Sequence, residues 1–230
     1  MLIGGIVVAL VSLIAGWFLA QLTGLVKDRL KVRQIHRSLL AELRELRVEL
    51  DRTLLIYTRQ LQIHALQGIG VDIPLKLSNH IFKNYYKDVV LSLNEAQRIS
   101  FQMIHTHIEE LNTEVVEFRA LTMRLHERAQ FEGVPTTAKE GERWGKTVMA
   151  QFSHVAETSW HIRHHLSNTD SPEMGFKTKA HQEYLQYLQG VQDEIQRLLL
   201  QAKQLNRADF ERIYNPNDFV KAILDPKKIP

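Results

Sequence analysis

The first 26 residues constrain this chain most, because none of them carries a charged side chain. The run from Leu2 to Ala20 is broken only by glycines, alanines and Ser12. In a helix rising about 1.5 Å per residue this run spans about 28 Å, close to the hydrocarbon thickness of a bilayer. A cleaved signal peptide would need a basic residue before a shorter apolar core, whereas the first basic residue here is Lys27. The sequence therefore predicts a retained transmembrane helix over residues 1–26.

Basic side chains follow the apolar run directly. Residues 1–66 hold nine Lys and Arg against five Asp and Glu, whereas residues 67–230 hold twenty against twenty-one. A basic flank suits anionic lipid headgroups and indicates the cytoplasmic side. We therefore expect a single-pass protein of the bacterial inner membrane, with its N-terminus outside and its body in the cytoplasm. The expected headgroup-binding residues are Lys27, Arg29, Lys31 and Arg33.

The expected span has two unlike faces. At 100° per residue its small side chains fall on one narrow stripe, and larger ones such as Val7 and Ile14 lie opposite. Small residues let helix backbones approach closely in lipid, which favours association of several copies. The expected pore-lining or helix-packing residues are Gly5, Ala9, Ser12, Gly16, Ala20 and Thr23.

The remaining residues predict an all-α fold. Neither Gly nor Pro occurs between Gly24 and Gly68, so the span should continue as a juxtamembrane helical stalk over residues 27–67. Its apolar positions alternate at spacings of three and four, which indicates one buried stripe and favours a bundle contact over a coiled-coil seam. This stripe consists of Leu39, Leu43, Leu46, Leu50, Leu54, Tyr57 and Leu61.

Residues 68–230 are expected to form a cytosolic antiparallel helical bundle. Loops are predicted at 68–79, 132–141 and 167–175, and helices at 80–93, 95–131, 144–166 and 177–206. Asn94 resembles an N-cap, with Gln97 as its capping-box partner. The expected core of the second long helix is Ile99, Met103, Ile104, Leu111, Val115, Phe118, Leu121, Met123 and Leu125.

Four of the eleven histidines crowd one expected helix. His154, His161 and His165 share a face, Glu157 precedes His161 by four residues, and His164 lies beside them. The HExxH motif and the Glu-x-x-His pair of di-iron bundles are absent. We therefore expect no metal site and no catalytic residue here, and favour a polar helix face or satisfied interface histidines. A response to pH ranks above metal binding and catalysis.

Other chemical signatures are weak. Glu110, Glu114 and Glu117 form an acidic stripe, which is typical of a solvated face and only around a pore axis would gather cations. Phosphate-binding glycine loops and nucleophile elbows are missing, and the chain has no cysteine for disulfides or thiolate catalysis. The body carries no net positive charge that would bind bulk nucleic acid. The sequence predicts no enzyme and no cofactor.

In architecture, the chain resembles the membrane-channel effectors of bacterial antiphage systems of the Hailong type. The resemblance covers the whole chain and rests on the uncharged span, the small-residue stripe, the basic collar at Lys27 to Arg33 and the cysteine-free helical body. It implies an oligomeric channel whose trigger is a nucleotide signal or a partner protein.

Two functions follow from these patterns. The first is a homo-oligomeric, single-span pore that disrupts the inner membrane when its body is triggered. The alternative is a membrane-anchored adaptor, in which the span only tethers a bundle that recruits a cytosolic partner. An anchored enzyme using the histidines is the third and weakest interpretation.

Overall fold

All regular secondary structure of the described residues is helical. The computed structural model describes residues 2–204, apart from the side chains of residues 2–12, 14, 15, 20 and 25. The elements are α1 Leu2–Ala65, α2 His80–Val89, the short 3-10 helix η1 Val90–Ser92, α3 Glu95–Phe131, α4 Ala138–Ser167 and α5 Lys179–Lys203. The prediction of an all-α helical bundle is therefore confirmed. The end predicted for the last helix, at Asn206, lies outside the described residues.

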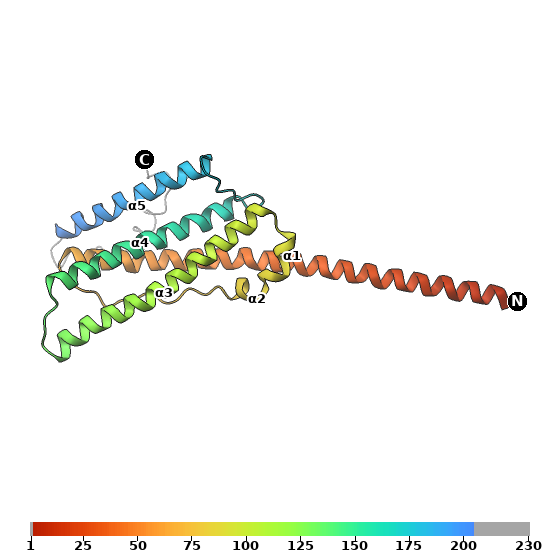
Figure 1. The fold of residues 1–230 in the computed structure, drawn as a ribbon, viewed down its shortest axis with the longest axis horizontal. Helices are drawn as coiled ribbons and strands as arrows, with labels where there is room; N and C mark the ends of the chain where they lie inside the picture. The colour runs from red at the N-terminus through yellow and green to blue at the C-terminus, as the bar shows by residue number, and fades with distance from the viewer. Residues whose placement is uncertain (1, 205–230) are drawn as a thin grey trace.

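The longest element, α1, is continuous over 64 residues, because no Gly or Pro occurs between Gly24 and Gly68. The predicted leucine stripe is a bundle contact, and each of its seven side chains is 2 % exposed or less. α1 packs mainly against α4 and also against α5 and α2. The bundle therefore includes α1 from Ile35 to Leu61, which is most of the stalk expected over residues 27–67. Figure 1 shows α1 passing through the whole bundle and projecting beyond it.

An extended segment over residues 68–79 determines the direction of α3. The Leu77 amide donates to Asn112 Oδ1 at 2.7 Å, and Asn112 Nδ2 donates back to the Leu77 carbonyl at 2.9 Å. Twelve extended residues reach about 40 Å, so this segment returns the chain along the bundle before α2 begins. As a result α1 and α3 run in the same direction, while α3, α4 and α5 alternate (Figure 1).

Two capping boxes set the starts of α3 and α4. At α3 the predicted cap is confirmed, because Asn94 Oδ1 accepts from the Gln97 amide at 2.9 Å and Gln97 Oε1 accepts from the Asn94 amide at 3.0 Å. At α4 the same exchange joins Thr137 and Glu140. α4 therefore begins at Ala138, six residues before the expected start at 144, and the predicted loop 132–141 was too long.

The core lies where α1, α3 and α4 meet. Its largest side chains include Tyr57, Phe101, Phe118, Trp144 and Phe152, all nearly inaccessible. The Trp144 indole donates to Thr122 Oγ1 at 2.9 Å, so its buried N–H is satisfied.

The face of α3 that points into this core differs in part from the expected one. Ile99 and Met123 were assigned to the core, but they are 53 % and 42 % exposed. The buried stripe instead includes Phe101 and Ile108, which keep the three-and-four spacing with Ile104, Leu111, Val115, Phe118 and Leu125.

A carboxylate from α1 caps the start of α2. Asn79 makes no side-chain capping bond there. Instead the buried Glu42 carboxylate accepts from the Ile81 amide at 2.6 Å and from the Phe82 amide at 2.9 Å. Burial raises the pKa of Glu42, although these two amide bonds oppose the rise. The contact attaches α2 to α1 near the point where α1 leaves the bundle.

Candidate functional site

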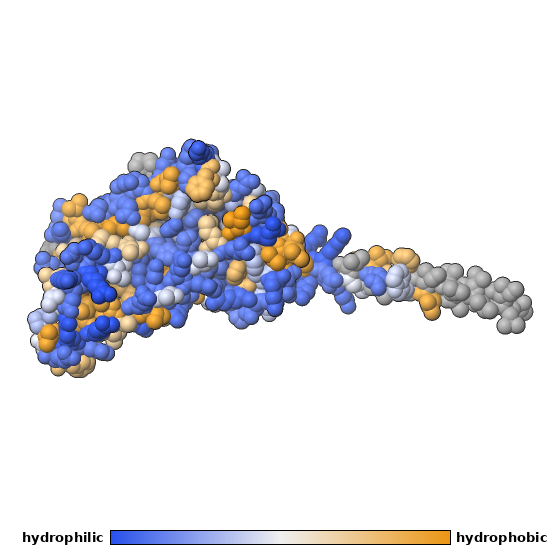
Figure 2. Space-filling view, in the orientation of Figure 1, coloured by the Kyte–Doolittle hydropathy of each residue, from blue (hydrophilic) through white to orange (hydrophobic). Residues whose placement is uncertain are grey.

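The projecting part of α1 is the first candidate site. Its described apolar side chains are exposed on several sides, and Leu13, Trp17 and Leu22 are 74 %, 58 % and 56 % accessible. A Cβ added at Gly16 would meet nothing within 4 Å, nor would one at Gly24. Figure 2 shows hydrophobic surface on the described part of this projection. A helix that exposes apolar residues in this way presents an uncovered hydrophobic surface.

The expected small-residue stripe lies on this projection. Gly16 and Thr23 are exposed, and the Thr23 hydroxyl donates to the Leu19 carbonyl at 2.7 Å. The side chains of Gly5, Ala9, Ser12 and Ala20 are outside the described residues.

Among the described residues, no helix is long and apolar enough to cross a membrane.

The expected basic collar connects the projection to the bundle. Lys27, Arg29, Lys31 and Arg33 are all exposed, and Figure 2 shows a hydrophilic stretch at this junction. Lys31 Nζ lies 3.2 Å from Asp88 Oδ2 of α2, so this residue also forms an ion pair with α2.

A cluster of histidines and carboxylates between α3 and α4 is the second candidate site. His107 Nδ1 of α3 lies 3.0 Å from His154 Nε2 of α4. The other nitrogen of His154 lies 3.0 Å from both carboxylate oxygens of Glu114. Glu110 Oε2 lies 3.8 Å from each of these two imidazoles, at His107 Nδ1 and His154 Nε2. Two residues of the expected acidic stripe thus face histidines, not solvent alone.

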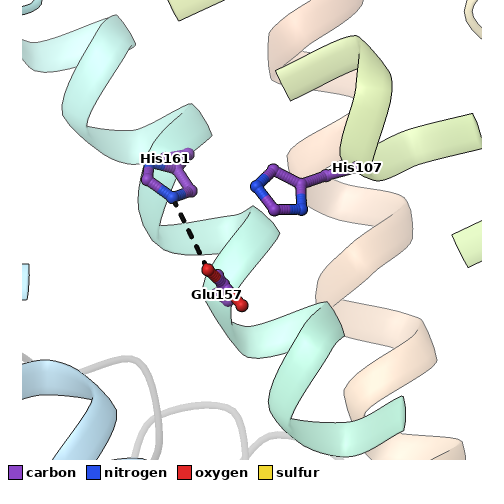
Figure 3. A group of neighbouring side chains, drawn as sticks. All are labelled: His107, Glu157 and His161. Atoms are coloured by element: carbon purple, nitrogen blue, oxygen red, sulfur yellow. Dashed lines mark ion pairs between the residues drawn. The ribbon is translucent and has the colours of Figure 1, made fainter. Parts of the chain in front are cut away.

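The cluster extends along α4 to His161. Figure 3 shows His107 facing both Glu157 and His161. The rings of His107 and His161 are stacked with centroids 5.4 Å apart, and His161 Nε2 lies 4.0 Å from Glu157 Oε1. The Tyr184 hydroxyl of α5 donates to that same carboxylate oxygen. Three helices therefore contribute to one polar cluster.

The surroundings give these histidines different proton affinities. At His154 burial acts to lower the pKa, but the hydrogen bond to Glu114 and the charges of Glu157 and Glu110 outweigh it and raise the pKa. Burial lowers the pKa of His107 and lowers that of His161 to about 3. His154 is therefore the member most ready to carry a proton, which it can donate to His107 while its other N–H faces Glu114.

Two sets of residues in the cluster have a composition suited to metal ligation. The potential ligand atoms of His107, Glu110 and His154 lie within 4.8 Å of one another, and so do those of His107, Glu157 and His161. Imidazole nitrogen and carboxylate oxygen are common ligands of zinc and related ions.

The four histidines grouped by sequence have different environments. His154 and His161 join the cluster, whereas His165 turns to α3, where its Nδ1 lies 2.8 Å from Ser100 Oγ. His164 stacks on Trp160 with centroids 5.0 Å apart. His107 was not singled out from the sequence. The sequence offered one signal for it, because His107 lies three residues before Glu110 and so shares a helix face with it. Their common partner, His154, is on α4 and could not be identified from this spacing.

Comparison with models of protein families, with curated proteins and with solved structures finds no match to this chain.

Proposed function

We propose that this chain is a homo-oligomeric, single-span membrane protein whose N-terminal helices together form a gated pore. One observation carries the proposal. α1 leaves the bundle and continues to Leu2 as a projecting helix, with exposed apolar side chains on its described part and no charged residue before Lys27.

A bilayer accounts for the exposed apolar surface of the projection. A helix satisfies its own backbone hydrogen bonds, so an apolar helix is stable in hydrocarbon without a partner. The basic residues from Lys27 to Arg33 come directly after it, at the position where anionic headgroups and the positive-inside preference would hold them. The bundle would then lie in the cytoplasm, beneath the bacterial inner membrane.

A pore requires several copies, because one helix cannot enclose a passage. The open space around Gly16 and Gly24 leaves room for close helix–helix approach. A passage lined by the small-residue stripe would have only Ser12 and Thr23 as polar side chains. Such an apolar constriction stays closed by excluding water.

The bundle would control the constriction through α1 itself. The stripe from Leu39 to Leu61 is buried in the bundle, where α1 packs against α4, α5 and α2, and the same helix continues without a break to Leu2. A change in packing of the bundle therefore tilts or rotates the projecting part directly. The resemblance to antiphage channel effectors suggests that a nucleotide signal or a partner protein supplies the trigger.

Two matched substitutions test the pore. Ser12→Asp should hydrate the constriction, so cells expressing it should lose membrane potential and grow poorly without a trigger. Val7→Asp, on the opposite face, should impair insertion or assembly and produce no leak. The measurements are growth and the signal of a potential-sensitive dye, with the membrane level and the assembly of each variant determined alongside. If Ser12→Asp inserts and assembles but leaves the potential unchanged, the pore proposal is refuted.

Exchange of the whole span separates a pore from the membrane-anchored adaptor. An adaptor uses its span only as a tether, so an unrelated leucine-rich span should preserve its activity. A pore should lose activity after that exchange, and it should also be impaired by Gly16→Leu, which widens the helix on the small-residue face.

A further inference from the structure

We propose that His107, His154 and Glu110 form a binding site for a divalent transition-metal ion of the zinc class, which links α3 to α4. The sequence predicted no metal, because the histidines of α4 alone lack a ligand motif. The structure supplies the missing ligands from α3. The proposal is independent of the pore, since it concerns only the bundle.

The ligand spacing fits a tetrahedral ion. With metal–ligand bonds of about 2.0 to 2.1 Å, neighbouring ligand atoms of a tetrahedral site lie about 3.4 Å apart. The three separations here are 3.0 Å between His107 Nδ1 and His154 Nε2, and 3.8 Å from Glu110 Oε2 to each. One distance is shorter and two are longer than the ideal value. Small side-chain rotations would therefore place all three ligand atoms at bonding distance from one ion.

The surroundings of His154 resemble those of a metal-bound histidine. A ligating imidazole usually donates its other N–H to a carboxylate, which fixes its orientation and strengthens it as a ligand. His154 faces His107 through Nε2, while its Nδ1 lies 3.0 Å from Glu114. Glu114 is therefore a positioning residue for His154 and not a ligand.

Accessibility also suits an exchangeable ion. The side chain of His154 is 14 % exposed and that of His107 20 %, whereas that of Glu110 is 58 % exposed. The two imidazoles thus form the less accessible inner part of the site, and Glu110 forms its solvent-facing rim. Three protein ligands leave a fourth position open to water or to another group.

Cobalt(II) provides the probe, because tetrahedral cobalt absorbs visible light and zinc does not. The full chain, prepared in detergent without a polyhistidine tag, should bind one cobalt ion per chain, and zinc should displace it. Glu110→Gln should abolish the tetrahedral spectrum, and because Glu110 is exposed, this variant should still fold. His107→Gln should have the same effect. Glu114→Gln should keep the spectrum but weaken binding by about 10- to 100-fold.

The matched control is His126→Gln, which removes an exposed histidine of α3 remote from the cluster. It should leave the cobalt spectrum, the stoichiometry and the displacement of cobalt by zinc unchanged. The proposal is refuted if the wild-type chain shows no tetrahedral cobalt spectrum. It is also refuted if Glu110→Gln and His107→Gln bind cobalt as the wild type does, because the ion would then lie elsewhere. Neither result would affect the pore proposal.

Discussion

Gly145 of α4 tests whether α1 and α4 pack as closely as the structure shows. A Cβ added there would overlap three ring atoms of His64 on α1. His64 also packs near Trp144, with ring centroids 6.3 Å apart, so it cannot turn away without losing a contact. Gly141 of the same helix is a matched control, since a Cβ there would meet nothing within 4 Å.

The two substitutions should change stability in opposite directions. Ala is favoured over Gly within a helix by about 0.8 to 1 kcal/mol, so Gly141→Ala should raise the free energy of unfolding by about that amount. Gly145→Ala has the same helical gain, but overpacking costs about 1 to 3 kcal/mol. We therefore expect Gly145→Ala to lower the free energy of unfolding by up to about 2 kcal/mol.

A double-mutant cycle isolates the contact. Urea unfolding of the full chain in detergent, followed by circular dichroism at 222 nm, measures each variant. In a His64→Ala background the clash is gone, so Gly145→Ala should become stabilising like Gly141→Ala. The close packing would be refuted if Gly145→Ala stabilised the wild-type chain as much as Gly141→Ala does.

Three further predictions concern the cap of α3, the cap of α2 and one buried histidine, His165. Asn94→Ala removes the capping box of α3 and should cost about 1 to 2 kcal/mol in urea unfolding; an unchanged midpoint would contradict the cap. Glu42→Gln leaves one amide of α2 without its acceptor, so it should cost about 1 to 3 kcal/mol and speed hydrogen exchange at Ile81 and Phe82; unchanged exchange would show that the bonds are unimportant. Burial, with His36 and His164 nearby, lowers the pKa of His165 to about 4. The unfolded chain binds a proton at His165 near pH 6.5, whereas the folded chain binds it only near pH 4. The contribution of neutral His165 to the free energy of unfolding is therefore fully present above pH 6.5. This contribution falls by about 1.4 kcal/mol per pH unit as the pH is lowered from 6.5 towards 4. His165→Gln should flatten this dependence between pH 6.5 and 4.5, and an unchanged slope would exclude His165 as its source.

Local patterns in the sequence were sufficient for most of the helices. The leucine stripe of α1, the cap at Asn94 and the end of α3 at Phe131 were all predicted correctly. These features depend on residues within one or two turns of each other, because periodicity, capping and helix breaking are local effects. The early start of α4 was missed because the Thr137–Glu140 box follows a loop rich in turn-forming residues.

The exposed faces were harder to predict than the helices. Ile99 and Met123 are apolar, yet they point outward, whereas Phe101 and Ile108 are buried. A 37-residue helix with apolar residues on several sides has more than one plausible stripe. Which stripe is buried depends on the helix that packs against it, and that information is not local.

The sequence by itself determined an uncharged N-terminal run, a basic collar and a set of long amphipathic helices. Tertiary structure alone decided that α1 and α3 run in the same direction, that Glu42 caps α2, and that His107 meets His154. The two imidazole nitrogens that lie 3.0 Å apart belong to residues 47 positions apart in the chain. The physical reason is that helical periodicity specifies which residues share a face, while only packing between helices specifies which faces meet.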